Sequence, residues 1–402
     1  MQPYRRILLT HIYFPPANKP YGLMLRHIAE RLSEHGHQVA VFAASDPADI
    51  TGNEAVASDL AKSGIEISRV PIRSRSGMAG KLASALAYVW ALVRHIVRTR
   101  PDVVTVASFP PLFAAFAVAI AGKIAGSKVL YHVQDIHPEI TAPKLPSVLR
   151  PLYRLVGALM NAVTLRLVAG VVTLSPDMCE ILVSRGAPEA RTIALNNLSL
   201  SSLGPQTGQA LDASGQRDRA FEIVYAGNMG AFQALDEVAA FVRAAAVVEG
   251  VRFTFVGEGS RREWLRSQLA DLCDNDRVRF LPFMPFAELQ PKLARASMGL
   301  VSLDALSTRY AYPSKIPTYL AMGLPLLCVF DRSSGLARDL ERHGLGLVVD
   351  QSSMEEGVAA LARIACDSSL EGEMRAHVSA YFSSVMSPEH YISRLNSLIR
   401  SL

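Results

Sequence analysis

The chain has 402 residues, half of them hydrophobic, and carries a formal net charge of +5 at pH 7. One ordinary hydrophobic core does not organise a chain of this length, so we expect two domains. The four cysteines lie far apart and none has a CxxC or Cys/His spacing, which argues against a zinc site or a disulfide scaffold and favours a reducing compartment.

Neither a targeting segment nor a membrane span is predicted. Arg5 and Arg6 lead straight into the apolar run 7–10, which indicates a buried strand rather than a signal peptide. The longest apolar stretch, residues 110–121, is shorter than the ~20 residues that a bilayer-spanning helix needs. We therefore expect a cytoplasmic protein that is soluble or peripheral to a membrane.

The N-terminal half alternates short apolar runs with longer helical patterns, which is typical of a parallel sheet with helices on both faces. A helix from about Leu23 to His35, ended by Gly36, separates the first two runs. The predicted strands are Ile7–Thr10, Gln38–Ala43, Glu66–Val70, Val103–Ala107, Val129–Val133 and Gly170–Leu174. Residues 1–200 are thus predicted to form one Rossmann-like domain.

Residues 201–219 are polar, rich in Gly, Ser and Gln, and without periodicity, so they predict a linker. The alternation then restarts, which predicts a second Rossmann-like domain over residues 220–380. Its expected strands are Glu222–Ala226, Arg252–Val256, Val278–Leu281, Gly299–Leu303 and Leu326–Phe330. Its expected helices are Leu235–Val248, Arg262–Leu272 and Pro285–Ala296.

The last segment, residues 381–402, predicts a helix that returns to the N-terminal domain, with its regular part at Tyr391–Leu402. The expected fold is therefore an α/β protein of two doubly wound domains. Ligands of such folds bind at the carboxyl ends of the strands, so we expect the site in a cleft between the domains.

The most informative motif spans residues 312–325. Pro313 leads into a short helix, Ser314 is a suitable N-cap, and Gly323 ends the helix before the next strand. The free N–H groups of the first helical turn, with Lys315 beside them, predict an anion site. The alternative is a purely structural helix.

Two glycine-rich turns follow predicted strands of the second half. They are Gly227-Asn228-Met229-Gly230 and Gly257-Glu258-Gly259. Glycines let a backbone approach a phosphate closely, and they also suit tight turns that need a positive φ. Both interpretations stay open for each turn.

Four polar side chains follow the strand that ends near residue 133: His132, Asp135, His137 and Glu139. A carboxylate at this strand end is able to orient a hydroxyl of a ligand. A single histidine here is more often structural, but four polar residues in eight positions favour function. A metal site built from the four is not expected, because the expected fold does not need one.

Two long stretches, residues 69–101 and 140–176, contain basic but no acidic residues, and in both the apolar residues follow helical spacing. Such helices suit an anionic membrane surface or a lipid diphosphate, and ordinary Rossmann helices are the alternative. A nucleic-acid partner is not expected, since no recognition helix or aromatic RNA motif is visible. The basic residues are Arg69, Arg73, Arg75, Lys81, Arg94, Arg98, Arg100, Lys144, Arg150, Arg154 and Arg166.

Taken together, the motifs and their order resemble the retaining glycosyltransferases of family four, which have the GT-B fold, and especially the bacterial enzymes of colanic-acid and O-antigen type. The resemblance covers nearly the whole chain. It is carried by Tyr13-Phe14-Pro15-Pro16, Gly22, Gly36-His37-Gln38-Val39, Pro101-Asp102-Val103-Val104, His132 to Glu139, Leu174-Ser175-Pro176-Asp177-Met178, Asn196-Asn197, Gly227 to Asp236, Val256-Gly257-Glu258-Gly259 and Pro313-Ser314-Lys315.

The resemblance implies transfer of a hexose or amino sugar from a UDP- or GDP-sugar, which is a co-substrate, with no further cofactor and no metal. Backbone N–H groups and cations aimed at the leaving diphosphate supply most of the catalysis. The implied catalytic residues are Asp135, His132 and Lys315. The implied donor-binding residues are Gly227, Asn228, Gly230, Gln233, Gly257, Glu258, Phe283, Pro313, Ser314, Lys315 and Thr318. The implied acceptor-binding residues are Gly22, His137 and Glu139.

The chain departs from the family at the donor site. Asn228 and Gln233 stand where relatives have the Arg and Lys that clamp the diphosphate. Thr318 and Tyr310 stand where many relatives have glutamates, and a threonine would hold a ribose more weakly. Lys315 therefore becomes the main phosphate cation.

Arg309 and Arg261 are possible helpers of that lysine. We expect a polyprenyl-diphosphate-linked saccharide acceptor at the inner face of the cell membrane, in surface-polysaccharide assembly. Two rivals remain, a GT-B sugar-nucleotide 2-epimerase and a catalytically silent GT-B subunit that binds a partner transferase. A dehydrogenase is disfavoured because no glycine fingerprint follows the first strand.

Overall fold

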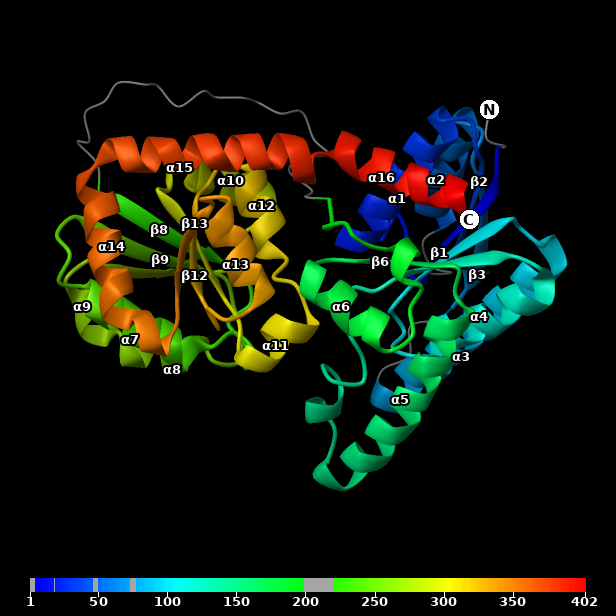
Figure 1. Cartoon of the computed structure of the whole chain (residues 1–402), viewed down its shortest axis with the longest axis horizontal. Coiled ribbons are helices and arrows are strands. Elements are labelled where there is room, and N and C mark those ends of the chain that lie inside the picture. Colours follow the sequence, from blue (N-terminus) through cyan, green and yellow to red (C-terminus); the bar gives the residue numbers. More distant parts are fainter. Residues whose placement is uncertain (1–3, 18, 46–49, 73–76, 199–219) are drawn as a thin grey trace. The chain divides into compact units, whose positions relative to one another are not determined.

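The computed structural model describes residues 4–17, 19–45, 50–72, 77–198 and 220–402. The chain divides into two compact units, residues 1–200 with 388–402, and residues 201–387. The predicted linker, 201–219, lies outside the described residues, as do Arg73 and Arg75. Each unit is described by itself below (Figure 1).

Unit 1 contains a seven-stranded sheet in the order β3-β2-β1-β4-β5-β6-β7, and every pair of neighbouring strands is parallel. The strands are β1 (Arg6–His11), β2 (Gln38–Ser45), β3 (Glu66–Pro71), β4 (Val103–Ala107), β5 (Lys128–His132), β6 (Gly170–Thr173) and β7 (Thr192–Ala194). The strand order reverses between β1 and β4, so the carboxyl ends of these two strands flank the topological switch point.

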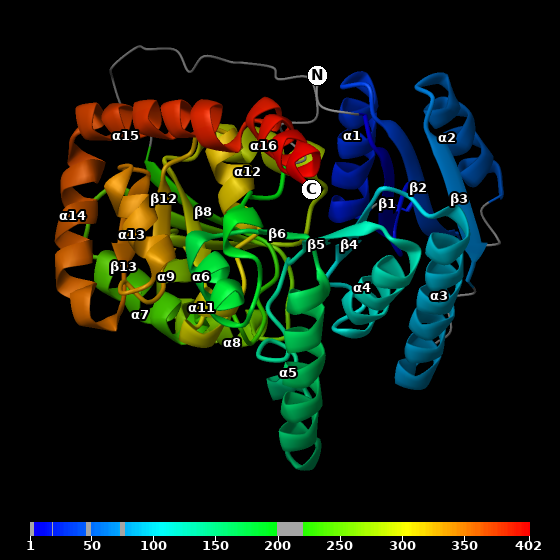
Figure 2. The same cartoon turned by 45° about the vertical axis from the view of Figure 1, so that its right-hand side comes forward.

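Helices cover both faces of this sheet. They are α1 (Pro20–Glu34), α2 (Ile50–Lys62), α3 (Gly77–Thr99), α4 (Phe113–Ala125), α5 (Arg150–Leu167), α6 (Pro176–Ser184) and α16 (Pro388–Ser401). On one face α16 packs beside α1, and His37 Nε2 lies 2.8 Å from Asn396 Oδ1. On the other face α3, α4 and α5 pack side by side, and α5 projects beyond the strands (Figures 1 and 2).

Unit 2 contains a six-stranded parallel sheet in the order β10-β9-β8-β11-β12-β13. The strands are β8 (Phe221–Ala226), β9 (Val251–Val256), β10 (Val278–Leu281), β11 (Met298–Ser302), β12 (Leu326–Val329) and β13 (Gly346–Val349). The helices are α7 (Leu235–Ala245), α8 (Arg262–Gln268), α9 (Ala270–Asp274), α10 (Phe286–Arg295), α11 (Ala305–Tyr310), α12 (Lys315–Ala321), α13 (Gly335–Arg342), α14 (Met354–Cys366) and α15 (Ser368–Tyr381). Its switch point lies between β8 and β11.

The predicted fold class is confirmed, because both units are doubly wound α/β units with parallel sheets. Several details differ. The predicted helix 262–272 is two helices that break at Leu269, the short strands β7 and β13 are not predicted, and α1 starts at Pro20. Residues 381–387 belong to unit 2 rather than to the returning helix, because α15 runs on into a π-helical stretch (Phe382–Met386) before Pro388 starts α16.

Candidate functional site

Lys315 is the first residue of α12, which lies next to the switch point of unit 2. Its ammonium donates hydrogen bonds to Gln233 Oε1 at 2.7 Å and to Tyr225 Oη at 3.1 Å. It also lies 4.2 Å from the centroid of the Tyr225 ring, a cation–π contact. Desolvation lowers the pKa of Lys315 from 10.5 to about 7. Lys315 is therefore a part-buried lysine whose charge titrates near neutrality.

The N-cap predicted at Ser314 is wrong in its mechanism. Ser314 stands at the N-cap position, but its side chain makes no capping hydrogen bond. Its φ of −60° and ψ of −13° are already helical, whereas a capping serine reaches the next N–H groups from an extended backbone. The N–H of Ile316 is bonded instead to the carbonyl of Pro313 at 3.0 Å. Lys315, rather than a capped helix mouth, is what distinguishes this segment.

Two tyrosines position Lys315, Tyr225 by direct contact and Tyr319 through helix α12, and the sequence predicts neither role. Tyr225 on β8 is buried, and its hydroxyl donates to the carbonyl of Asn228 at 2.6 Å. Tyr319 on α12 accepts a hydrogen bond from the N–H of Ala226 at 2.8 Å, which joins α12 to the end of β8. The sequence offers one general clue to them: a tyrosine in a buried strand or helix normally needs a hydrogen-bond partner for its hydroxyl.

Tyr319 also explains a glycine inside β11. A Cβ on Gly299 would lie 2.4 Å from the Tyr319 ring, so only glycine leaves room for the ring at this point. Helix α12 therefore packs tightly over β11 and β8, and this packing fixes where Lys315 starts the helix.

The glycine turns pack back to back at the carboxyl ends of β8 and β9. Gly227, Gly257 and Gly259 have φ values of +139°, +136° and +155°. Added Cβ atoms would meet Lys315 Cε at 2.9 Å, Gly227 O at 2.1 Å and Met229 O at 2.3 Å, respectively. The two turns are also joined by a hydrogen bond from the N–H of Met229 to the carbonyl of Glu258 at 2.8 Å. Backbone conformation and close packing thus account for all three glycines, and Gly227 lies directly against Lys315.

The other predicted donor residues also belong to unit 2. The structure brings together Gly227, Asn228, Gln233 and Lys315 through the contacts above. The side chains of Asn228, Glu258, Phe283 and Ser314 are exposed, that of Thr318 is part-buried, and Pro313 and Gly230 are buried. No described contact of Phe283 or Thr318 joins it to Lys315.

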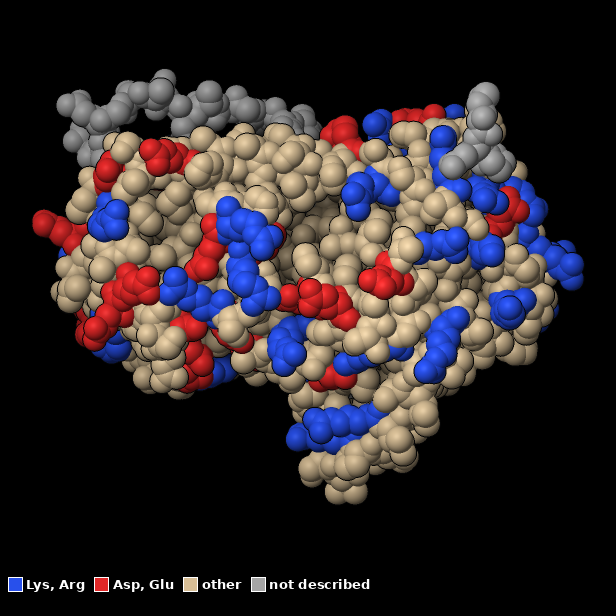
Figure 3. Space-filling view, viewed as in Figure 1, with Lys and Arg blue, Asp and Glu red and all other residues tan. Residues whose placement is uncertain are grey.

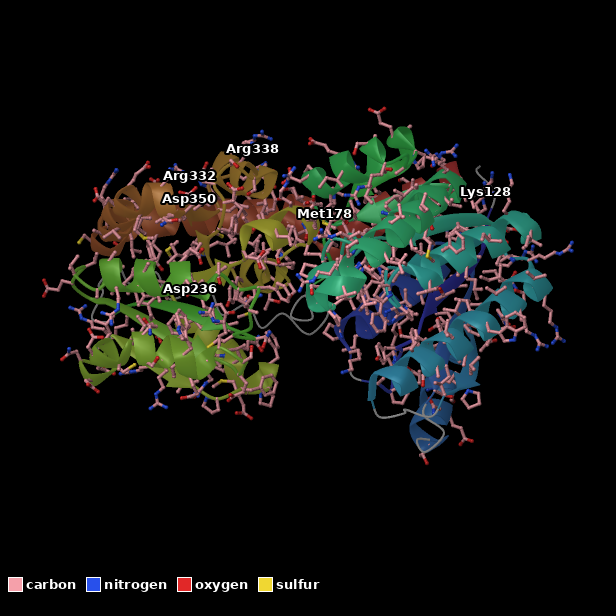
Figure 4. The ribbon with its side chains drawn as sticks, turned by 90° about the horizontal axis from the view of Figure 1, so that it is seen from below. Lys128, Met178, Asp236, Arg332, Arg338 and Asp350 are labelled. Carbon is pink, nitrogen blue, oxygen red and sulfur yellow. The ribbon has the colours of Figure 1, made fainter. Side chains whose placement is uncertain are left out.

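Of the two possible helper cations, Arg261 is already engaged. Its guanidinium donates to both carboxylate oxygens of Asp236 on α7, at 2.6 and 3.0 Å, and lies 3.9 Å from the centroid of the Trp264 ring. Asp236 is labelled in Figure 4. Arg309 is exposed on α11. Lys315 thus stays the cation that contacts the turn after β8.

An acidic cavity of about 310 Å³ lies at the carboxyl ends of β11, β12 and β13, lined by Asp304, Asp331 and Asp350 among others. These carboxylates already accept backbone N–H groups at helix starts and turns. Asp350 accepts from Ser352, Ser353 and Arg332, and Figure 4 shows Asp350 beside Arg332. Local capping and turns therefore account for these three carboxylates.

In unit 1, His132 lies at the carboxyl end of β5 and is only 1% exposed. Its Nδ1 is hydrogen-bonded to Tyr21 Oη at 3.1 Å, whereas its Nε2 is buried without a partner among the described residues. Burial lowers the pKa of His132 to about 4, so the imidazole is neutral at pH 7. His132 Nε2 is thus a buried polar atom without a partner among the described residues, at the end of the strand next to β4.

Asp135 follows in the same loop. Its N–H and that of Gln134 donate to Ser108 Oγ, at 3.4 and 3.1 Å, which ties the loop after β5 to the end of β4. Burial raises the pKa of the Asp135 carboxyl, and the charge of Lys144 opposes this rise. Asp135 is thus a part-buried carboxylate at the same sheet edge as His132.

The three residues predicted to bind acceptor each have a structural partner. His137 is buried, its Nδ1 is hydrogen-bonded to Thr141 Oγ1 at 2.7 Å, and burial lowers its pKa to about 4. Glu139 forms a bidentate ion pair with Arg185, whose two terminal nitrogens lie 3.2 and 2.9 Å from the carboxylate oxygens. A Cβ on Gly22 would lie 2.9 Å from the carbonyl of Tyr13. Packing and pairing account for these three residue types, and a role with acceptor stays a prediction.

Across the described part of the chain, no cluster of three or more His, Cys, Asp or Glu side chains is placed to hold a metal ion. The same part contains no helix that is long and apolar enough to cross a membrane.

Family models cover most of the chain. A glycosyl transferase 4-like domain matches residues 21–197, and a glycosyl transferases group 1 domain matches residues 220–367. No curated protein matches the chain at a significant level.

Solved structures share the fold over nearly the full length. HepE from Anabaena, in complex with UDP, is 18% identical with a TM-score of 0.66, over 99% of this chain and 100% of that one. A glycosyltransferase from Rickettsia africae is 12% identical with a TM-score of 0.67, over 98% of this chain and 97% of that one. The lipopolysaccharide outer core galactosyltransferase WaaB is 12% identical with a TM-score of 0.66, over 98% of this chain and 99% of that one. Because two glycosyl transferase domain models match in succession on two doubly wound units, the chain belongs to the glycosyltransferases of the GT-B fold.

Proposed function

We propose that this protein transfers a hexose or amino sugar from a UDP- or GDP-sugar to a polyprenyl-diphosphate-linked saccharide, with retention of the anomeric configuration, in surface-polysaccharide assembly. The observation that carries the proposal is the placement of the Lys315 ammonium against Gly227 and Tyr225, at the carboxyl end of β8 beside the switch point. An anionic diphosphate fits this edge of a doubly wound sheet.

The neighbours support the donor class. HepE has been solved with UDP, with UDP and glucose, and with UDP-glucose. WaaB is named as a lipopolysaccharide outer core galactosyltransferase, and WaaG as a glycosyltransferase involved in lipopolysaccharide biosynthesis. At 12 to 18% identity these proteins establish the fold, and a nucleotide-sugar donor and a surface-polysaccharide context come to this chain as part of the proposal.

In the proposed reaction, bond cleavage places negative charge on the leaving diphosphate. Lys315 is suited to stabilise that charge, because a part-buried cation interacts more strongly than one in water. Gln233 orients the ammonium through its 2.7 Å hydrogen bond, in the place of a second cation. The leaving phosphate accepts the proton of the acceptor hydroxyl, so neither a cofactor, a metal nor a dedicated base is proposed.

His132 and Asp135 are proposed to position the sugar or the acceptor hydroxyl. A neutral imidazole with an unpaired Nε2 is able to form one hydrogen bond with a hydroxyl without carrying charge. The Asp135 carboxylate at the same sheet edge adds an acceptor. Gly22, His137 and Glu139 stay proposed neighbours of the acceptor.

The proposed setting is the inner face of the cell membrane. Exposed basic residues on the N-terminal helices, Arg94 and Arg98 on α3 and Arg154 and Arg166 on α5, are suited to anionic lipid headgroups. Figure 3 shows Lys and Arg spread over this part of unit 1.

The test is turnover of UDP- and GDP-sugars by the purified chain, with Lys315→Ala as the key variant. We expect a loss of at least about tenfold in turnover, because one charge-assisted contact to the diphosphate disappears. Lys292→Ala, which removes an exposed lysine from α10, is the matched control and should stay at the wild-type rate. Wild-type turnover by a folded Lys315→Ala protein would refute the phosphate role.

The same assay separates the rival interpretations. A silent subunit would neither hydrolyse nor transfer any nucleotide sugar, and a 2-epimerase would change the donor sugar without transfer. The rivals stay relevant because Asn228 and Gln233 replace the usual cations.

A further inference from the structure

Helix α5 has the reverse of the usual amphipathic pattern. Its buried residues are Gly157, Asn161, Thr164 and Leu165. Its outer face carries Leu152, Leu155 and Leu159, which are 62%, 62% and 61% exposed. A surface helix in water normally buries its large aliphatic side chains and exposes its small and polar ones. The exposed residues Leu149, Leu152, Leu155, Val156, Leu159 and Val163 follow helical spacing and are here called the α5 ridge.

The inner face of α5 cannot turn outward, because it holds the loop that follows β5. Asn161 Nδ2 donates to the carbonyl of His137 at 3.3 Å. A Cβ on Gly157 would lie 2.9 Å from Leu112 Cδ1 and 3.0 Å from Pro138 Cβ. The small and polar residues are therefore needed on this face, and the aliphatic residues are fixed on the other.

The ridge belongs to a larger apolar surface. Helix α4 packs between α3 and α5, and both α3 and α4 add exposed apolar side chains. These are Leu82, Leu86 and Trp90 on α3, and Phe113, Ile120 and Ile124 on α4. Apolar residues gathered over three helices exceed the single exposed ones of an ordinary surface.

The charge around the ridge has one sign. Between residues 140 and 176 the chain contains no Asp or Glu. Arg154 and Arg166 are exposed on α5, and in Figure 3 the lower part of the projection shows blue above a tan tip and no red. Arg150 is different, since its guanidinium donates to the carbonyls of Leu145 and Pro143 and braces the turn before α5.

We infer that the α5 ridge inserts into the acyl-chain layer of a lipid bilayer and anchors the protein by apolar burial. The inference rests on the proposed function in one respect: α5 holds the loop of His137, so insertion brings the lipid carrier of the acceptor to that loop. It changes the basis of the membrane contact from headgroup charge alone to insertion of Leu and Val side chains.

Lipid fits the ridge better than a protein does. The ridge itself is wholly aliphatic, whereas protein interfaces are enriched in aromatic residues, Met and Arg. The two described cavities of about 410 and 310 Å³ are lined by charged residues such as Arg252, Arg279, Asp331 and Asp350, so neither is an apolar groove that would receive the ridge of a second copy. A second copy packed ridge against ridge is the remaining alternative, and the oligomeric state of the lipid-free protein decides it.

Flotation tests the inference directly. The full chain is mixed with vesicles of phosphatidylcholine, with or without phosphatidylglycerol, and floated at low salt and at about 1 M NaCl, where the Debye length is about 3 Å. We expect flotation on both vesicles and retention at high salt. Leu152→Asp/Leu155→Asp should reduce the bound fraction at least about tenfold, since two charges would enter the acyl layer.

The matched control is Val247→Asp, which places the same charge on an apolar residue of unit 2 that is 82% exposed. It should float like the wild type. Both variants alter exposed positions, so far-UV circular dichroism and thermal unfolding should be unchanged. The inference is overturned if the wild type does not float, if it floats only on anionic vesicles and is released by salt, or if the double variant floats like the wild type.

Light scattering of the lipid-free protein addresses the second-copy alternative. A wild-type dimer that the double variant converts to a monomer would overturn the inference in favour of self-association.

An activity comparison keeps the inference separate from the proposed function. Leu152→Asp/Leu155→Asp should keep wild-type kcat with a water-soluble saccharide acceptor and lose turnover with a vesicle-borne lipid-linked one. If no transfer is seen with any acceptor, the proposed function fails, while flotation still decides the inference.

Discussion

Lys315 combines a buried position with an unusual set of partners. The ammonium is held by a tyrosine hydroxyl, a glutamine carbonyl oxygen and an aromatic face, and none of these carries a negative charge. Nothing among these contacts offsets the desolvation that lowers the pKa of Lys315 to about 7. An arriving diphosphate would supply the missing negative charge.

This arrangement predicts a pH dependence of donor use. The folded pKa, about 7, lies below the ordinary 10.5, so the free protein loses the Lys315 charge as pH rises through 7. We expect kcat/KM for the nucleotide sugar to fall above pH 7, by up to about tenfold per pH unit. Bound diphosphate raises the pKa of Lys315, so the fall in kcat should come at higher pH.

The measurement is a pH profile of kcat and kcat/KM from about pH 6 to about pH 9. Lys315→Ala should lack this fall in kcat/KM. A flat wild-type profile would contradict the assignment.

Protein stability should rise with pH where kcat/KM falls. Between pH 7 and 10.5 the Lys315 side chain holds fewer protons in the folded state than in the unfolded state, so the free energy of unfolding increases with pH in that window.

The sequence predicts a phosphate cation at Lys315, and the structure shows which side chains hold that lysine. The lysine was identified from its own short motif, but its partners Gln233 and Tyr225 lie 82 and 90 residues away along the chain. In the sequence, Gln233 is an implied donor-binding residue that replaces a cation, and Tyr225 is part of a predicted buried strand. Long-range pairing of this kind has no local pattern.

At the scale of elements, the turns after β8 and β9 act as one unit with α12. Their backbones are hydrogen-bonded to each other, and Gly227 contacts the stem of Lys315. The turn thus sets the position of the ammonium through steric contact.

Gly227→Ala tests this coupling. The alanine would combine a φ of +139° with a Cβ 2.9 Å from Lys315 Cε, so we expect a loss of about 1–3 kcal/mol in unfolding free energy and a higher KM for the donor. The measurements are urea unfolding and steady-state kinetics.

Gly250→Ala is the control, because Gly250 also has a positive φ, +77°, in unit 2 but has nothing within 4 Å of an added Cβ. It should cost about 1–2 kcal/mol of stability without changing KM. An equal KM change in both variants would show that backbone strain alone acts.

Strands were easier to predict than helix ends. The buried strands β1, β4 and β8 are short apolar runs bounded by polar or turn residues, and their predicted ranges overlap the observed ones. Helix α1 starts at Pro20, a residue type that suits the first helical turn but does not belong to the apolar period, and no Gly or Pro marks the break at Leu269. The exposed leucines of α5 have helical spacing, but spacing does not say which face is buried.

For the whole molecule, the division into two units predicts two unfolding transitions, because each unit has a sheet and a core of its own. All the predicted donor residues lie in unit 2. A nucleotide should therefore raise the unfolding temperature of unit 2 only. Gly250→Ala lowers the unfolding temperature of the same unit and so identifies its transition.

Differential scanning calorimetry with UDP and with GDP measures this effect. At a concentration of about 100 Kd the expected stabilisation is about 2.7 kcal/mol, or roughly 5–10 °C for a unit of this size. The nucleotide with the larger shift indicates the base of the donor, and Lys315→Ala should reduce the shift. A shift confined to the transition of unit 1 would contradict the assignment of the donor to unit 2.

The sequence by itself determined the α/β class and the two doubly wound units, and it predicted Lys315 as the phosphate cation, because hydrophobic period and short motifs are local properties of the chain. Only the tertiary structure decided that Ser314 does not cap α12, that Tyr225 and Gln233 hold the lysine, and that α5 presents leucines outward. The reason is physical. Capping geometry, burial and pKa depend on which distant segments pack together, and α5 must keep its small and polar face for the loop that carries His137.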